Sequence, residues 1–132
     1  MGLLILLLDT CAYLIATYET ERLPARARSA ILAADVRYWS PIGTWEIAIK
    51  SNLGRLDFPR EAFRDLDAGL LALRATPLPL THAQAAGVHA LPALHRDPFD
   101  RMLIAQALSV RAAIVTSDTT IPTYPGVTTI WE

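Results

Sequence analysis

Carboxylates that follow short apolar segments are the residues of this chain best suited to chemistry. Asp9 comes directly after the apolar run Leu3–Leu8, and Asp118 follows a second run in the sequence Ile-Val-Thr-Ser-Asp. In an open parallel sheet, ligands bind beyond the carboxyl ends of the strands. If both runs are parallel strands, we therefore expect the two carboxylates at one edge of the sheet. Taken singly, each residue is also explained as a helix N-cap or a turn residue, because aspartate is favoured in both roles.

Two further carboxylates, Glu46 and Asp100, lie beside apolar stripes of predicted helices. Asp97 precedes Pro98 and is fully explained as the N-cap of a helix. Asp100 is less easily explained, because its neighbours one and two helical turns further on are apolar. A carboxylate on a buried face needs a cation or a metal ion. Glu46 can pair with Lys50 at a spacing of four residues, yet it also borders the apolar stripe of its own helix.

These four carboxylates can converge at one edge of the predicted sheet, where they would repel one another. A divalent cation among them would offset that repulsion, and hard cations such as Mg²⁺ or Mn²⁺ prefer oxygen ligands. The chain contains no glycine-rich phosphate loop and no Gly-x-Ser-x-Gly segment. Its histidines, His82, His89 and His95, lack the spacing of a zinc motif. The sequence therefore predicts a carboxylate metal site.

The elements that must position this site alternate along the chain. Strands are predicted at Leu3–Leu8, Val36–Trp39, Ala75–Leu80, Ala113–Thr116 and Thr128–Trp131. Helices are predicted at Cys11–Thr17, Leu23–Ala34, Pro41–Leu53, Arg60–Leu73, Thr81–Val88 and Pro98–Val110, with Ile42, Trp45, Ala48 and Ile49 forming the apolar stripe of the third. Such alternation is typical of a parallel α/β sheet. We find no linker or internal repeat, and we expect residues 1–132 to form a single domain.

Composition limits the partners and the compartment of the protein. Of 132 residues, 52% are hydrophobic. The net charge of -1 does not indicate a nucleic-acid binder, so any contact with nucleic acid must come from a local group of residues. Leu3–Leu8 is too short to span a membrane, which takes about 20 residues. The single cysteine, Cys11, excludes an internal disulfide and is expected to be a small core residue. We therefore expect a cytoplasmic protein with no membrane partner.

Four sequence blocks resemble the PIN-domain nucleases and, within them, the VapC toxins of bacterial toxin-antitoxin pairs. The blocks are Leu-Leu-Asp-Thr-Cys at 7–11, Pro-Ile-Gly-Thr-Trp-Glu-Ile-Ala-Ile-Lys at 41–50, His-Arg-Asp-Pro-Phe-Asp-Arg-Met-Leu-Ile-Ala-Gln-Ala at 95–107 and Val-Thr-Ser-Asp at 115–118. The second and third blocks are the specific ones. The resemblance implies a three-layer α/β/α sandwich around a central, mostly parallel five-stranded sheet, in agreement with the alternation of elements.

The resemblance also implies roles for individual residues. The catalytic and metal-binding positions are Asp9, Glu46, Asp100 and Asp118. The residues that would support these ligands are Thr10, Thr44, Asp97 and Thr116. The residues that we expect to position RNA phosphates are Lys50, Arg96 and Arg101, which flank the acidic blocks and are otherwise explained as solvated surface.

The resemblance implies that the protein is a toxin and that it acts as an endoribonuclease. One or two Mg²⁺ or Mn²⁺ ions would activate water to cleave RNA, leaving 5'-phosphate and 3'-hydroxyl ends. The implied partners are a VapB-like antitoxin and a second copy of the chain. Aromatic residues could form these interfaces or belong to the core: they are Tyr13, Tyr18, Trp39 and Trp45.

Two other readings of the same residues stay open at this stage. His89 and His95 could act as general acid and base without metal, which would give a cyclic phosphate product. A catalytically silent PIN-like interaction module is the non-enzymatic alternative. A phospho-acceptor module is less well supported, because such modules use a lysine after a late strand and this chain has none there.

Overall fold

A parallel β-sheet forms the centre of the structure, a computed structural model that describes residues 2–132. Its strands are β1 (Ile5–Leu8), β2 (Val36–Trp39), β3 (Thr76–Pro77), β4 (Ala113–Val115) and β5 (Thr129–Ile130). They lie in the order β3-β2-β1-β4-β5, and every neighbouring pair is parallel. All five predicted strands are confirmed, and four of them are shorter than predicted.

Seven α-helices connect the strands in the described part of the chain. They are α1 (Thr10–Tyr18), α2 (Ala25–Ala33), α3 (Pro41–Asn52), α4 (Glu61–Arg64), α5 (Leu66–Ala72), α6 (His82–Gly87) and α7 (Pro98–Val110). Single 3-10 turns occur at Thr20–Arg22, Val88–Ala90 and Ile121–Thr123. The helix predicted over Arg60–Leu73 is two helices, because Asp65 leaves the helical conformation at φ -97° and ψ 13°.

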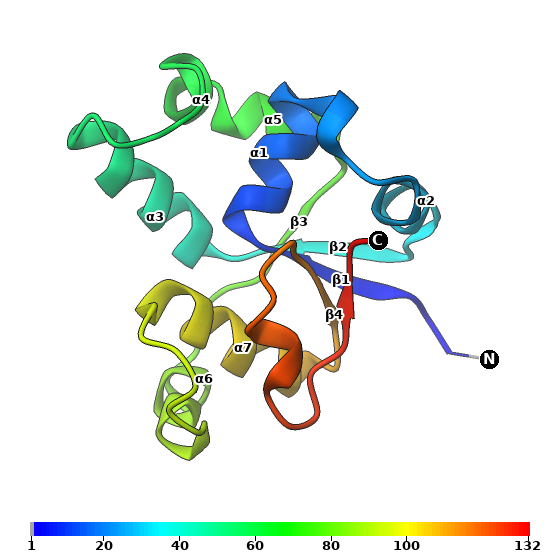
Figure 1. Cartoon of the computed structure of the whole chain (residues 1–132), viewed down its shortest axis with the longest axis vertical. Coiled ribbons are helices and arrows are strands. Elements are labelled where there is room, and N and C mark those ends of the chain that lie inside the picture. Colours follow the sequence, from blue (N-terminus) through cyan, green and yellow to red (C-terminus); the bar gives the residue numbers. More distant parts are fainter. Residues whose placement is uncertain (1) are drawn as a thin grey trace.

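The helices cover both faces of the sheet and give it three layers (Figure 1). On one face, Leu6 and Leu8 of β1 pack with α1, α2, α4 and α5; on the other, Leu7 packs with α7 and with the turn at Ile121–Thr123. Successive residues of a strand point to opposite faces, so the uninterrupted run of leucines is what a strand covered on both sides requires. The predicted α/β/α sandwich is confirmed.

Two sequence expectations about burial need correction. Trp45 was expected on the buried stripe of its helix but is 57% exposed, because the buried face of α3 is rotated to include Ile42, Glu46 and Ile47. The Trp45 ring meets the ring of Phe99 edge-on, with centroids 5.3 Å apart. Cys11 was expected in the core but is exposed, since the first turn of α1 lies at the open edge of the sheet.

The other aromatic residues proposed for an interface divide between core and surface. Tyr13 and Trp39 are buried and pack against each other, with ring centroids 4.9 Å apart. They therefore belong to the core, while Tyr18 is partly buried at the end of α1. Within residues 2–132, no helix is long and apolar enough to cross a membrane.

Candidate metal centre

Asp9 lies at the point where β1 ends and α1 begins. Its Oδ1 atom accepts a hydrogen bond of 2.7 Å from the backbone N–H of Ala12 and thereby caps α1. The side chain is almost completely buried, with the residue 5% exposed. Burial raises the pKa of Asp9 to about 6, and the charges of Glu46 and Asp118 add to this rise, although hydrogen bonds from Thr116 and Ala12 oppose it. Asp9 is therefore both a helix cap and an energetically costly charge.

Glu46 lies on the buried face of α3 and is 6% exposed. Its Oε2 atom is 2.6 Å from Lys50 Nζ, as the four-residue spacing predicted. Partial burial lowers the pKa of Lys50, but the hydrogen bond and charge of Glu46 outweigh this effect and raise it. The pair thus brings one cation to the edge of the carboxylate site.

Asp97 and Asp100 lie at the start of α7. Asp97 Oδ1 accepts hydrogen bonds from the backbone N–H groups of Phe99 and Asp100, at 2.9 and 3.2 Å, and is the N-cap that the sequence predicted. Burial raises the pKa of Asp100 to about 8, and the charges of Asp97, Asp9, Glu46 and Asp118 reinforce the rise. Asp100 thus combines burial with the charges of four neighbouring carboxylates.

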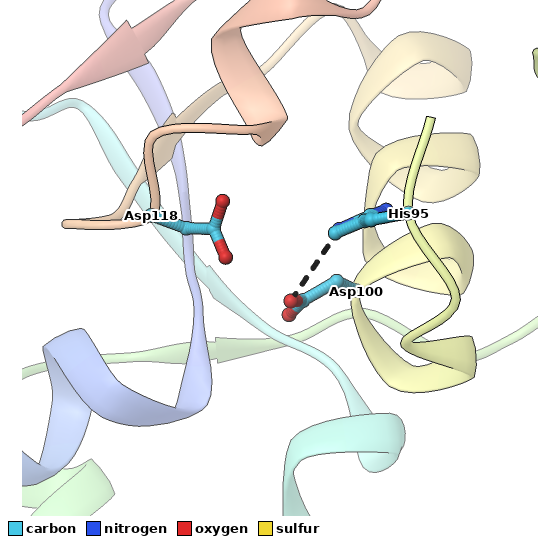
Figure 2. A group of neighbouring side chains, drawn as sticks. All are labelled: His95, Asp100 and Asp118. Carbon is cyan, nitrogen blue, oxygen red and sulfur yellow. Dashed lines mark ion pairs between the residues drawn. The ribbon is translucent and has the colours of Figure 1, made fainter. Parts of the chain in front are cut away.

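Asp118 lies in the turn that follows β4. Its Oδ1 atom accepts hydrogen bonds from the backbone N–H groups of Thr120 (2.6 Å) and Ile121 (3.1 Å), so the turn holds the carboxylate in one orientation. Its own N–H donates to Thr116 Oγ1 at 3.0 Å. Figure 2 shows the Asp118 carboxylate directed toward Asp100, which comes from the start of α7.

The four predicted carboxylates share one cavity of about 260 Å³. It is lined by Asp9, Thr10, Cys11, Glu46, Lys50, Asp97, Asp100, Ser117 and Asp118. Lys50 is the one cationic side chain among these lining residues, against five carboxylates. Parallel strands with their carboxyl ends at one edge bring these residues together from four segments of the chain.

His95 joins this cluster, although the sequence suggested it only as an acid or base without metal. One ligand atom each of His95, Asp100 and Asp118 lie within 4.8 Å of one another (Figure 2). His95 Nε2 is 3.6 Å from Asp100 Oδ2. His95 precedes the N-cap of α7 by two residues, and no periodic pattern relates it to Asp100, so only the loop conformation reveals this proximity. The second histidine of that hypothesis, His89, is exposed in the turn Val88–Ala90.

The predicted supporting hydroxyls occupy different places. Thr116 accepts a hydrogen bond from the N–H of Asp118, and its hydroxyl opposes the rise in the pKa of Asp9. Thr10 lines the cavity, and its hydroxyl is buried with no hydrogen-bond partner among the described residues. Thr44 accepts a hydrogen bond of 2.9 Å from the Trp39 indole. Its hydroxyl therefore bonds to a core side chain, and Thr44 does not line the cavity.

The predicted phosphate-positioning residues also differ in their surroundings. Arg96 is exposed beside the N-cap of α7. Arg101 donates from Nη1 to the carbonyl of Pro92 (2.7 Å) and to the Tyr124 hydroxyl (3.1 Å). Its guanidinium thus fastens the preceding loop to α7, a role that the sequence did not indicate.

The residues of the cavity fit a divalent cation. Carboxylate oxygens are the ligands that Mg²⁺ and Mn²⁺ prefer. Burial and the charges of neighbouring carboxylates raise the pKa values of Asp9 and Asp100, and a compensating positive charge would oppose this rise. A cation bound among these oxygens would supply that charge and keep the carboxyls ionised.

Comparisons with known proteins agree with this architecture. The structure of VapBC2 from Rickettsia felis bound to a DNA fragment from their promoter aligns with a TM-score of 0.74 and 16% identity, covering 98% of this chain and 100% of that chain. DNA-bound VapBC from Salmonella typhimurium aligns with a TM-score of 0.69 and 20% identity, covering 96% of each chain. No curated protein matches the sequence. The PIN domain family model matches residues 6–127, nearly the full length, and the chain therefore belongs to the PIN domain family.

Proposed function

We propose that this protein is a divalent-metal-dependent endoribonuclease and the VapC-type toxin of a toxin-antitoxin pair, acting in the cytoplasm. The observation that carries the proposal is the cavity in which Asp9, Glu46, Asp100 and Asp118 meet with Lys50 as the one lining cation. Membership of the PIN domain family supports nuclease chemistry, and the structural similarity to two VapBC proteins supports the toxin assignment.

In this proposal the four carboxylates hold one or two Mg²⁺ or Mn²⁺ ions. A bound divalent cation supplies Lewis-acid chemistry, since it lowers the pKa of water and neutralises charge on the phosphodiester as the P–O bond breaks. The chain's own contribution is to hold the ligands in place before substrate arrives. Asp9 is held by the Ala12 N–H and Asp118 by two N–H groups of its turn, so neither carboxylate needs to reorganise.

The substrate in this proposal is an RNA strand that enters with its phosphates near the carboxylate cavity. Lys50, Arg96 and Arg101 would position those phosphates. A net charge of -1 means that attraction must come from these few side chains rather than from the whole surface.

We further propose that the chain pairs with a VapB-like antitoxin and forms a homodimer. The two structural neighbours described above are VapBC structures bound to DNA. An antitoxin that covers the carboxylate cavity would keep RNA away from the site.

Cleavage of a labelled total-RNA pool tests the nuclease assignment. Wild type and Asp9→Asn are compared with Mg²⁺ or Mn²⁺ and then with excess EDTA, and the ends of the products are analysed. Asp67→Asn is a matched control, because Asp67 is an exposed aspartate on α5 outside the cavity. We expect metal-dependent cleavage that leaves 5'-phosphates, persists in the control and is lost in Asp9→Asn.

Two other outcomes would contradict the proposal. Metal-independent cleavage with cyclic phosphates would move the chemistry to His89 and His95. No cleavage under any condition, with a copurifying antitoxin excluded, would favour a catalytically silent PIN-like interaction module.

A further inference from the structure

The buried hydroxyl of Tyr124 lies at the centre of a hydrogen-bond network behind the carboxylate cavity. Tyr124 is 2% exposed. Its oxygen is 2.6 Å from His95 Nδ1, 3.1 Å from Arg101 Nη1 and 3.3 Å from the backbone nitrogen of His95. Three nitrogens therefore surround one phenol oxygen. Which of these four atoms donate hydrogen bonds depends on which of them carry a proton.

Two of the three nitrogens can only donate. A guanidinium has no acceptor, and a backbone N–H has none either. The phenol oxygen therefore accepts hydrogen bonds from Arg101 and from the His95 backbone, which occupy its two lone pairs. Its own proton must then go to the third nitrogen, His95 Nδ1, because within residues 2–132 this hydroxyl has no other hydrogen-bond partner.

This count of donors assigns the tautomer of His95. In a neutral imidazole, one nitrogen accepts and the other carries the proton. Since Nδ1 accepts from Tyr124, the proton lies on Nε2. His95 Nε2 is buried, has no hydrogen-bond partner among the described residues and faces Asp100 Oδ2 at 3.6 Å. Figure 2 shows the imidazole ring edge directed at the Asp100 carboxylate.

We propose that His95 is a positioning residue for the metal site, whose Nε2–H, oriented by Tyr124, holds one oxygen of Asp100 and leaves the other for the cation. This inference rests on the proposed function, because it assigns Asp100 to metal binding. The separation of 3.6 Å is too long for a hydrogen bond, but contacts of this kind tighten when a site is loaded. The buried N–H has an energetic reason to approach Asp100, since a buried donor without an acceptor is unfavourable.

The same geometry argues against His95 as a metal ligand. Its Nε2 is close enough to Asp100 and Asp118 for the three to share an ion. Coordination would need a lone pair on Nε2 and so would move the proton to Nδ1. The Tyr124 oxygen would then face three donors, and its own buried proton would have no acceptor. The two roles therefore differ in the position of a single proton, which can be measured.

Nitrogen-15 NMR of the metal-free wild type tests the tautomer directly. We expect the proton of neutral His95 on Nε2 and an unprotonated Nδ1. In Tyr124→Phe the hydroxyl proton is missing, so the preference for this tautomer should weaken. A wild-type spectrum with the proton on Nδ1 would overturn the proposal whether or not the protein binds metal.

Binding of Mn²⁺ tests the positioning role. We expect His95→Ala to weaken Mn²⁺ affinity by about 10-fold or more, the range for residues that orient metal ligands. His95→Gln, whose amide N–H can replace the Nε2 donor, should recover part of that loss. His89→Ala is the control, because His89 is an exposed histidine outside the cavity. Melting temperatures identify any variant that fails to fold, and Tyr124→Phe gives a second, independent perturbation.

Electron spin echo spectroscopy of bound Mn²⁺ separates the positioning role from coordination. We expect no nitrogen coupling to the ion that depends on His95. A coupling that disappears in His95→Gln would make His95 a ligand and overturn the proposal, as would an unchanged affinity in His95→Ala. Mn²⁺ binding without RNA cleavage by the wild type would overturn the nuclease function alone, whereas no Mn²⁺ binding at all would overturn both.

Discussion

The two sides of the carboxylate cavity differ in how the fold holds their charges. We call Asp9 and Glu46 the inner side, and His95, Asp100 and Asp118 the outer side. On the inner side, Asp9 caps α1 and Glu46 pairs with Lys50, so each carboxylate has a defined partner. On the outer side, two backbone N–H groups hold Asp118, but no N–H or O–H group of residues 2–132 hydrogen-bonds to the Asp100 side chain. The pKa of Asp100 rises to about 8, against about 6 for Asp9.

This difference indicates which part of the site depends most on a bound ion. The secondary structure around the inner side exists without metal, because capping and an ion pair along one helix already orient its carboxylates. The neighbouring charges that raise the pKa of Asp100 are those of the other carboxylates, and the His95 Nε2 atom that faces Asp100 has no hydrogen-bond partner within residues 2–132. The outer side is therefore where a cation changes the electrostatics most.

The largest expected effect comes from replacing one carboxylate on each side of the cavity by the corresponding amide. Asp100→Asn and Glu46→Gln should each lower RNA cleavage by about 100-fold or more, since direct ligands matter more than the groups that orient them. Their effects on the metal-free protein should differ. At a pH above about 8, where Asp100 is ionised, Asp100→Asn removes an uncompensated charge and should raise the melting temperature. Glu46→Gln leaves Lys50 without its partner and should not.

Thermal unfolding in EDTA, beside a single-turnover cleavage assay, measures both effects. Asp67→Asn again serves as the exposed control. A lower melting temperature for Asp100→Asn than for wild type would show that the two sides do not differ in the way proposed.

The second effect is a pH dependence of stability in the metal-free protein. The pKa values of Asp9 and Asp100 in the folded state lie above the ordinary value of 3.8. The folded protein therefore binds more protons than the unfolded chain, and stability falls as the pH rises from about 4 to about 8. A rise of the Asp9 pKa to about 6 corresponds to a loss on the order of 3 kcal/mol.

Urea unfolding between about pH 5 and pH 8 measures this slope. Asp100→Asn should flatten the upper part of the curve, because the group with the pKa of about 8 is gone. Excess Mg²⁺ should stabilise wild type most at the high end, since the cation binds ionised carboxylates and excludes protons. A slope that is the same in wild type and Asp100→Asn would contradict the assignment.

The sequence predicted the inner side better than the outer side, for a physical reason. A residue after a strand and a pair spaced by four along a helix follow from local periodicity, so Asp9, Glu46 and Lys50 could be placed directly. The relation between His95 and Asp100 depends on a loop conformation and on Tyr124, which lies 29 residues away from His95 in the chain. No local pattern encodes such a contact.

The sheet could be predicted from the sequence, but the exposure of Trp45 could not, because only the second depends on exact packing. Apolar runs separated by helices define strands whatever their exact packing. The exposed stripe of α3 depends on how far the helix rotates about its axis. A rotation of about one residue brings Glu46 and Ile47 inward and leaves Trp45 57% exposed.

A smaller effect tests whether Lys50 limits metal binding on the inner side. Lys50 Nζ lies 2.6 Å from Glu46 Oε2 and competes with a cation for that oxygen. Removing one positive charge about 6 Å from a divalent ion in a solvated site changes binding by about 1.4 kcal/mol, or roughly 10-fold. Lys50→Met should therefore tighten Mn²⁺ binding by about that factor. A Mn²⁺ titration with Arg55→Met as the exposed control measures it, and weaker binding in Lys50→Met would contradict the competition.

The smallest expected effect concerns the two arginines that flank the outer side. In a non-cleaving Asp100→Asn background, Arg96→Gln should reduce the salt dependence of RNA binding by about one phosphate contact. It should not change stability, because Arg96 is exposed.

In the same background, Arg101→Glu should weaken RNA binding and flatten its salt dependence. It should also lower the melting temperature, since Arg101 donates hydrogen bonds to Pro92 and Tyr124. Fluorescence anisotropy at several salt concentrations separates these contributions. An unchanged salt slope in Arg101→Glu, with a lower melting temperature, would leave Arg101 a structural residue and Arg96 the phosphate contact.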